Sequence, residues 1–253
     1  MGCAMDDKFP PLYSYSFNEA RKQNRLDLWQ ISHNANVACK EAIDSILRFN
    51  CKEDSIPENT AKDLLDAFGF KRMNWVLAAS IQRRKNEPFS ESARQWAQNN
   101  YCPLGTSGSL STRVKEFTVQ SPVKALECLV SQTQAQYQAL GLFGIQHCEK
   151  GAWSEDLEGK VLILSPDSLK ECYWEPKNQL WLAEGGFGCS PNAAGRAVYA
   201  TCLGDGEHTR WDRSDFVGVI REECMPEWAK ESLAHLRPQQ QVDAPTMNGM
   251  TMK

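Results

Sequence analysis

The spacing of apolar residues changes once along this chain of 253 residues, near residue 150. Before that point apolar residues recur every three or four positions, which places them on one face of a helix. In the longest such stretch, residues 25–50, they are Leu28, Ile31, Ala35, Cys39, Ala42, Ile43, Ile46 and Leu47. After Gly151 short apolar runs alternate with turn residues, which is typical of strands. The sequence therefore predicts a helical first part and a strand-rich second part.

Helix boundaries in the first part follow from capping and turn residues. The predicted helices span residues 17–24, 25–50, 60–68, 71–84, 90–98 and 122–140. Gly69 suits the left-handed position that ends a helix, and Pro122 suits a first helical turn. We expect a short strand over 116–120, after a loop rich in Gly, Ser and Thr over 100–114.

The second part reads as a small sheet closed by a helix. Strands are expected at residues 160–164, 179–183, 197–203 and 215–220, and Pro226 opens a last helix that ends near Leu236. The predicted fold class is α+β, with an N-terminal helical domain followed by a small antiparallel-sheet domain and its terminal helix. The expected domains are 13–150 and 151–236, followed by a disordered tail over 237–253.

Composition excludes several classes of protein. Hydrophobic residues make up 42% of the chain, enough for a packed core, yet no apolar run approaches the length that spans a bilayer. The N-terminus lacks the apolar segment of a signal peptide, so we expect a location in the cytoplasm of the producing cell. The ten cysteines show no CxxC spacing and are expected to be free thiols, with neither a metal nor a cofactor predicted.

Charge is distributed unevenly between the two parts. Residues 1–150 carry 18 basic and 16 acidic side chains, whereas 151–253 carry 10 and 16. Neither balance predicts nucleic-acid binding by itself. The shift in charge supports a boundary near residue 150.

The densest polar cluster, residues 204–215, is the candidate for chemistry. Acids, a histidine and arginines at this density are typical of an acid/base site, with His208, Asp212 and Arg213 as candidate catalytic residues. The alternative is a charged hairpin between strands that turns at Gly204-Asp205-Gly206. The glycine-rich run 185–188 matches no phosphate-binding pattern and is expected to be a turn or bulge.

Candidate binding residues are basic or aromatic. The run Arg83-Arg84-Lys85 suits either a helix C-terminus or contact with phosphate or an acidic partner. Arginine and tryptophan dominate protein-binding hot spots. The other candidates for binding are Trp174, Arg210, Trp211 and Arg213.

Two stretches resemble known families. Residues 26–47 (LDLWQISHNANVACKEAIDSIL), 68–82 (FGFKRMNWVLAASIQ) and 89–97 (FSESARQWA) resemble the domain-of-unknown-function family numbered thirty-eight forty-nine, over about residues 13–130. That family is found in conjugative elements and phages of gut bacteria. Residues 180–220 resemble a short module found in accessory proteins of these same mobile elements. The resemblance implies a gene of a conjugative element or phage of gut bacteria, a context in which small proteins often counter host defence.

These observations lead to one favoured function and two alternatives. The favoured one is a non-enzymatic protein that binds a host defence effector and inhibits a nuclease, of the anti-CRISPR or anti-restriction type. The first alternative is an enzyme that acts on a nucleotide or protein through the cluster over 204–215. The second is a nucleic-acid-binding regulator that uses the basic run over 83–85, with steeply salt-dependent affinity.

Overall fold

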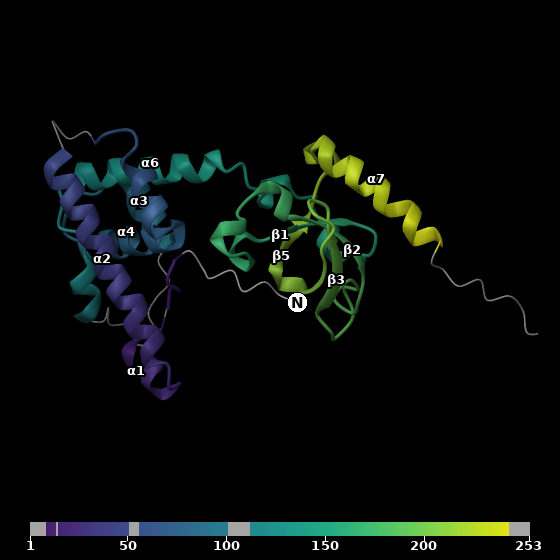
Figure 1. Ribbon diagram of the computed structural model, residues 1–253, viewed down its shortest axis with the longest axis horizontal. Coiled ribbons are helices and arrows are strands. Elements are labelled where there is room, and N and C mark those ends of the chain that lie inside the picture. The colour runs from purple at the N-terminus through teal and green to yellow at the C-terminus, as the bar shows by residue number, and fades with distance from the viewer. Residues whose placement is uncertain (1–8, 14, 51–55, 101–111, 243–253) are drawn as a thin grey trace, which may run out of the picture. The chain divides into compact units, whose positions relative to one another are not determined.

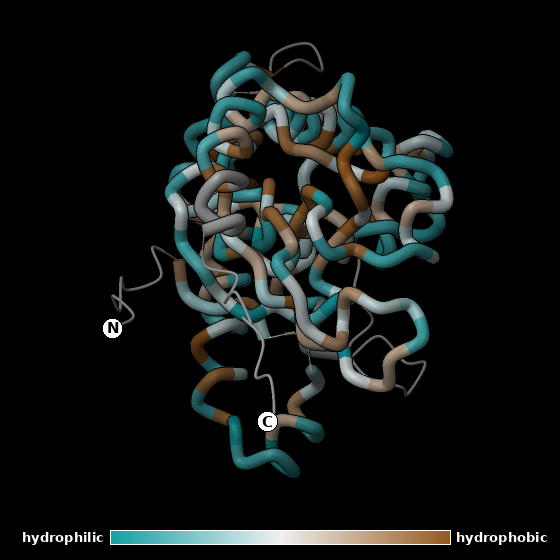
Figure 2. The backbone as a smooth tube through the Cα atoms, turned by 90° about the vertical axis from the view of Figure 1, so that its right-hand side faces the viewer, coloured by the Kyte–Doolittle hydropathy of each residue, from teal (hydrophilic) through white to brown (hydrophobic). Residues whose placement is uncertain are grey.

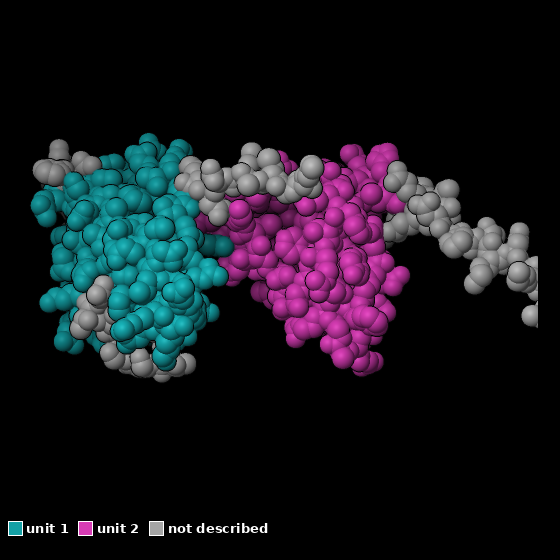
Figure 3. Space-filling model, turned by 60° about the horizontal axis from the view of Figure 1, so that its bottom comes forward, with its two compact units in different colours: residues 1–139 teal, residues 140–253 magenta. Residues whose placement is uncertain are grey.

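The chain forms two compact units, residues 1–139 and 140–253, each with a hydrophobic core of its own (Figure 3). The computed structural model describes residues 9–13, 15–50, 56–100 and 112–242. The α+β class predicted from the sequence is confirmed: a helical unit is followed by an antiparallel sheet and a terminal helix (Figure 1). The loop expected over 100–114 lies mostly outside the described residues.

The first unit consists of helices. They are α1 (Phe17–Lys22), α2 (Leu26–Asn50), α3 (Thr60–Phe68), α4 (Phe70–Arg83), α5 (Glu91–Asn100), the 3-10 helix η1 (Thr112–Phe117) and α6 (Val123–Ala139). The bounds follow the predicted ones closely, because caps and apolar stripes are local signals. Ser16, for example, caps α1 by accepting a hydrogen bond from the Glu19 backbone N–H.

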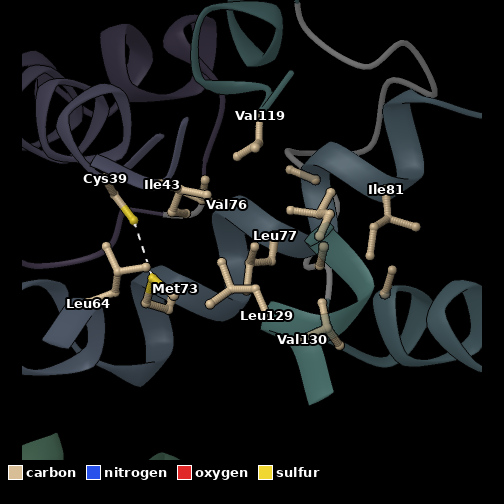
Figure 4. Packing of buried hydrophobic residues seen from close by; sticks show 14 of the residues in the cluster. Cys39, Ile43, Leu64, Met73, Val76, Leu77, Ile81, Val119, Leu129 and Val130 are labelled. Atoms are coloured by element: carbon tan, nitrogen blue, oxygen red, sulfur yellow. Dashed lines mark hydrogen bonds between the residues drawn. The ribbon is translucent and has the colours of Figure 1, made fainter. Parts of the chain in front are cut away.

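Helix α4 is the centre of this unit. Its buried residues surround the helix instead of forming one stripe, as expected of a helix enclosed by others. Helices α2, α3, α5 and α6 all contact it. Met73 meets Cys39 of α2, with Sδ and Sγ 3.7 Å apart, and Leu77 and Ile81 continue the core toward α6 (Figure 4).

The strand predicted over 116–120 is wrong. Residues 112–117 form η1, and the residues that follow pair with side chains instead of a neighbouring strand. The Val119 N–H donates to Ser80 Oγ at 2.9 Å, and the Gln120 N–H donates to Asp44 Oδ1 at 2.9 Å. Because these side chains satisfy the backbone donors, the apolar segment is buried without a sheet.

The second unit is a five-stranded antiparallel sheet in the order β4-β3-β2-β1-β5. Its strands are β1 (Val161–Leu164), β2 (Leu180–Gly185), β3 (Ala197–Cys202), β4 (His208–Asp212) and β5 (Phe216–Val219), followed by α7 (Glu227–Val242). Short 3-10 helices link them: η2 (Ile145–His147), η3 (Ala152–Ser154), η4 (Pro166–Ser168), η5 (Glu171–Tyr173), η6 (Pro176–Asn178), η7 (Arg213–Asp215) and η8 (Glu222–Cys224). Strand β4 was not predicted from the sequence, because its side chains are mostly polar and show no regular alternation of apolar and polar residues.

Both faces of the sheet are apolar over most of their extent. One face packs Leu162, Trp181 and Val198 against the loops around Trp153. The other packs Ile163 and Leu182, with their neighbours, against α7.

The hydropathy along the backbone alternates within the helices, as expected of elements with one buried face (Figure 2). Helix α7 extends beyond the predicted end at Leu236 to Val242, and the rest of the expected tail lies outside the described residues.

Residues 140–150, assigned to the helical domain from the sequence, make their contacts in the second unit. Cys148 forms an antiparallel bridge with Ile220, and the Glu149 N–H donates to the Val219 carbonyl at 2.9 Å. Phe143 packs against the apolar cluster that includes Ile163, Leu182 and Ala229 of α7. This segment therefore covers the outer edge of β5, which a periodicity argument does not reveal.

Within the described residues, no helix combines the length and apolar character that crossing a lipid bilayer requires.

Candidate functional site

The polar cluster predicted over 204–215 is divided by the geometry of β4. Successive side chains of a strand point to opposite faces, so His208 and Arg210 share one face and Trp211 lies on the other. On β3, Tyr199 pairs with Arg210 and Thr201 pairs with His208. We call the side chains on this side of the sheet the outer face; they are Glu184, Tyr199, Thr201, His208 and Arg210. Tyr199, His208 and Arg210 are exposed, Glu184 is half-buried and Thr201 is buried.

His208 belongs to a hydrogen-bonded trio on the outer face. Its Nδ1 lies 2.8 Å from Glu184 Oε2 and 3.2 Å from Thr201 Oγ1. Thr201 Oγ1 donates to the other Glu184 oxygen at 2.8 Å. A carboxylate at Nδ1 favours a proton there, which leaves Nε2 as the basic nitrogen. The His208 side chain as a whole is 55% exposed.

Asp212 has a structural task at the end of β4. Its carboxylate accepts hydrogen bonds from the Ser214 hydroxyl and the Ser214 backbone N–H, and it pairs with Arg196 at 3.1 Å. These interactions, with the Ser214 hydroxyl first, lower the pKa of Asp212 to about 2. The side chain caps η7 and does not meet His208 in any contact that the structure records.

Arg213 ties loops together. Its guanidinium donates to the carbonyls of Gly188, at 2.6 Å, and Trp153, and lies 4.7 Å from the centre of the Trp153 ring. The structure thus separates the three catalytic candidates, because each of them is held by different neighbours.

The two tryptophans proposed as binding residues both pack against neighbours in the second unit, to different extents. Trp174 is 7% exposed, and its Nε1 donates to the Pro166 carbonyl at 2.8 Å. Trp211 packs edge-on against Trp181, with ring centres 5.3 Å apart. The Trp174 ring is therefore enclosed, whereas Trp211 is half-buried.

Other aromatic side chains are exposed instead. Tyr199 is 47% exposed on the outer face, and Phe187 is 75% exposed in the glycine loop that follows β2. Gly186 has a φ of +106°, and a Cβ there would lie 3.1 Å from the Tyr199 ring and 2.4 Å from the Ala197 carbonyl oxygen. The loop is the bulged turn expected from its glycines; Gly186 lies against the Tyr199 ring, and the Phe187 side chain lies against Gly195.

The basic run at the end of α4 is only partly available. Arg84 pairs with the Glu87 carboxylate and donates to the carbonyls of Val119, at 3.3 Å, and Ser121, at 2.9 Å. Its side chain is 10% exposed, whereas Arg83 is half-buried and Lys85 is exposed. Arg84 therefore fastens the segment before α6 and contributes little positive surface.

Sequence reasoning missed a second polar site, in the helical unit. His33 Nε2 lies 2.6 Å from Glu116 Oε2, across a sequence separation of 83 residues. The His33 ring is stacked on Trp29, with ring centres 4.8 Å apart. The spacing of four between Trp29 and His33 on one helix face was the available signal. Glu116 could not be found, because only the tertiary fold brings it to α2.

The part of the chain that the structure describes contains possible metal ligands and thiols. No group of three or more His, Cys, Asp or Glu residues able to hold a metal occurs there. The described cysteines are free, as predicted. Burial raises the pKa of the Cys39 thiol to about 12 and of the Cys202 thiol to about 11, so both are held as unreactive thiols.

The helical unit matches a known family. The model of the family described as protein of unknown function, DUF3849, covers residues 12–138. The chain belongs to the DUF3849 family. The DUF3849 region coincides with the first compact unit, and it includes His33, Glu116 and the whole core around α4. No curated protein and no solved structure matches the chain.

Proposed function

We propose that this DUF3849 protein is a mobile-element accessory protein that acts by binding another protein, and that the partner is a host defence nuclease which it inhibits. The observation that carries the binding role is the outer face together with Phe187. This surface combines exposed Tyr199 and Phe187 with exposed Arg210. Tyrosine and arginine are enriched at binding hot spots, and an aromatic side chain left in water gains free energy when a partner covers it.

The identity of the partner rests on the sequence resemblance to accessory genes of mobile elements. Inhibition by docking on a protein fits the near-neutral balance of the chain, since its net charge is only −4. The exposed edge of the sheet adds a second means of contact. His208 and Arg210 lie on the outermost strand, where an extended segment of a partner is able to pair.

A binding and inhibition assay tests this proposal. The full chain is measured against purified CRISPR effectors and restriction nucleases. Tyr199→Ala and Phe187→Ala are each expected to weaken binding to the partner by roughly tenfold or more. Tyr173→Ala is the matched control, because Tyr173 is 41% exposed and lies outside the outer face. Binding to none of the nucleases, or equal binding by all variants, contradicts the proposal.

The trio of Glu184, Thr201 and His208 favours an enzyme as the second candidate. A histidine oriented by a carboxylate, with its other nitrogen accessible, is the arrangement of a general base. Replacing His208 by Gln would abolish such an activity, whereas Asp212→Asn and Arg213→Lys would act through stability alone. An activity that survives His208→Gln excludes this candidate. The basic run, with Arg84 engaged, gives less support to a nucleic-acid-binding regulator.

A further inference from the structure

The sheet of the second unit has one covered edge and one open edge. Strand β5 forms the covered edge, because residues 140–150 lie along it and Cys148 forms a bridge with Ile220. Strand β4 forms the other edge, and within the described residues only β3 pairs with it. An edge strand of this kind presents backbone groups to which a further strand is able to bond.

The register of β3 and β4 shows which backbone groups of the open edge point outward. The Cys202 N–H of β3 donates to the Glu207 carbonyl at 2.8 Å. Bonding alternates along an antiparallel pair, so the N–H and C=O groups of His208 and Arg210 point away from β3. None of these four groups has a hydrogen-bond partner among the described residues.

Arg210 adds a positive charge to this edge. Its side chain is exposed on the outer face and makes no ion pair or hydrogen bond with any described residue. Glu184, the acidic member of the outer face, is already bonded to Thr201 and His208. Charge complementarity therefore favours an acidic side chain directly opposite Arg210 on an added strand.

A second copy of the chain suits this edge less well than an acidic segment. In a two-fold pairing that uses all four outward groups, His208 stands opposite Arg210, so the guanidinium meets no acid. A shift that brings Asp212 opposite Arg210 loses a hydrogen bond, because the Asp212 N–H already donates to Asp215 Oδ2 at 2.8 Å. The Asp212 carboxylate is also paired with Arg196 at 3.1 Å.

We propose that β4 binds an extended acidic segment of a partner protein, which joins the sheet as a new edge strand antiparallel to β4. The inference rests on the protein-binding role proposed above and names the chemistry of the segment that is bound. In an antiparallel pair, the residue that exchanges both hydrogen bonds with Arg210 carries its side chain on the outer face as well. A glutamate at that position meets the guanidinium while its backbone pairs with the edge, and this fixes the register.

Titration of the full, ¹⁵N-labelled chain with a short capped peptide of alternating glutamate and valine, followed by NMR, tests the inference. We expect a Kd on the order of 1 mM, with shifts of the amide signals of His208 and Arg210. A peptide of alternating lysine and valine is expected to leave these signals unchanged, because its charge is opposite.

Methylated peptides distinguish strand addition from general charge attraction. Methylating the glutamate nitrogens, which face β4 in the proposed register, is expected to abolish binding because a methylated amide has no N–H to donate. Methylating the valine nitrogens, which face away from β4, should change the Kd by less than about twofold. Equal effects of the two methylation patterns contradict strand addition.

Two variants test the role of the charge. Arg210→Gln is expected to weaken binding of the acidic peptide by at least about threefold, a modest factor because the guanidinium is exposed. Arg48→Gln, at an exposed arginine in the last turn of α2, is the matched control and should bind as the wild type does. Equal loss in both variants, equal binding of the lysine peptide, or no shift up to tens of millimolar would overturn the inference.

Two further comparisons complete the test. Shifts at His208 and Arg210 that depend on protein concentration without peptide would assign the edge to a second copy and overturn the inference. None of these measurements involves a nuclease. A chain that inhibits a nuclease but fails to bind the acidic peptide therefore contradicts this inference alone, whereas one that binds the peptide but no nuclease contradicts only the proposed inhibition.

Discussion

At the scale of single residues, Arg72 is a buried arginine with a structural role. It is 2% exposed, and its guanidinium joins the segment before α1 to α2. Nη1 donates to the Ser32 carbonyl at 3.0 Å and to Asn36 Oδ1, and Nη2 donates to the Pro10 carbonyl at 2.7 Å. The sequence, which places Arg72 in an apolar helix, gave no sign that a cation is buried there.

Replacing Arg72 by methionine keeps most of its volume and removes its donors. Because several buried acceptors lose their partner at once, the free energy of unfolding is expected to fall by about 3 kcal/mol. Arg83→Met, at a half-buried position of the same helix, should change it by less than about 0.5 kcal/mol. Urea denaturation measures both variants, and equal losses would show that Arg72 has no special role.

The lowered pKa of Asp212 predicts that the stability of the fold depends on pH. A folded-state pKa of about 2, below the ordinary value, means that the carboxylate stabilises the native state above its unfolded pKa. This stabilisation is lost as the pH falls toward about 2. Thermal unfolding of the wild type and of Asp212→Asn between mildly acidic pH and pH about 2 should therefore converge. A difference in Tm that stays constant over that range contradicts this role.

At the scale of elements, the junction between α3 and α4 depends on one residue. Gly69 is the single residue between the two helices, with φ of 78° and ψ of 163°. This backbone conformation is open almost only to glycine, and it differs from the left-handed helical region that asparagine tolerates. The sequence predicted the helix end correctly, but the left-handed geometry expected there differs from the one observed.

Substitutions at Gly69 distinguish these two geometries. Gly69→Ala and Gly69→Asn are both expected to lower the free energy of unfolding by about 1–3 kcal/mol. Gly151→Asn is the control, because Gly151 has φ of 82° and ψ of −15° and a Cβ there meets no atom within 4 Å. That variant should cost less than about 1 kcal/mol. If asparagine rescues position 69 relative to alanine, the assigned conformation is wrong.

At the scale of the whole molecule, each unit has its own core. The core of the first unit lies around α4, and the second unit packs the two faces of its sheet separately. The division falls between Ala139 and Leu140, so residues 140–150 complete the edge of β5. A chain cut at residue 150 would leave that edge open.

Fragments test this division. We expect residues 1–139 and 140–253, expressed separately, each to give a single cooperative unfolding transition by circular dichroism, because each retains a full core. A fragment that begins at residue 151 should be less stable than 140–253, since it lacks Phe143 and the bridge at Cys148. Failure of either full unit to fold alone contradicts the independence of the two cores.

Local patterns determined much of this protein from sequence alone. The helices, four of the five strands, the glycine turn before β3 and the family followed from capping residues, hydrophobic period and motif residues, since these signals act over a few neighbouring positions. The strand predicted at 116–120 failed because Ser80 and Asp44, far away in sequence, satisfy its backbone donors. The tertiary structure alone decided which polar residues meet: it joined His33 to Glu116 and His208 to Glu184, and it engaged Arg84 and Arg213 with backbone carbonyls. Such contacts join chain segments that lie dozens of residues apart in the sequence. The spacing of neighbouring residues carries no information about which distant segments will meet.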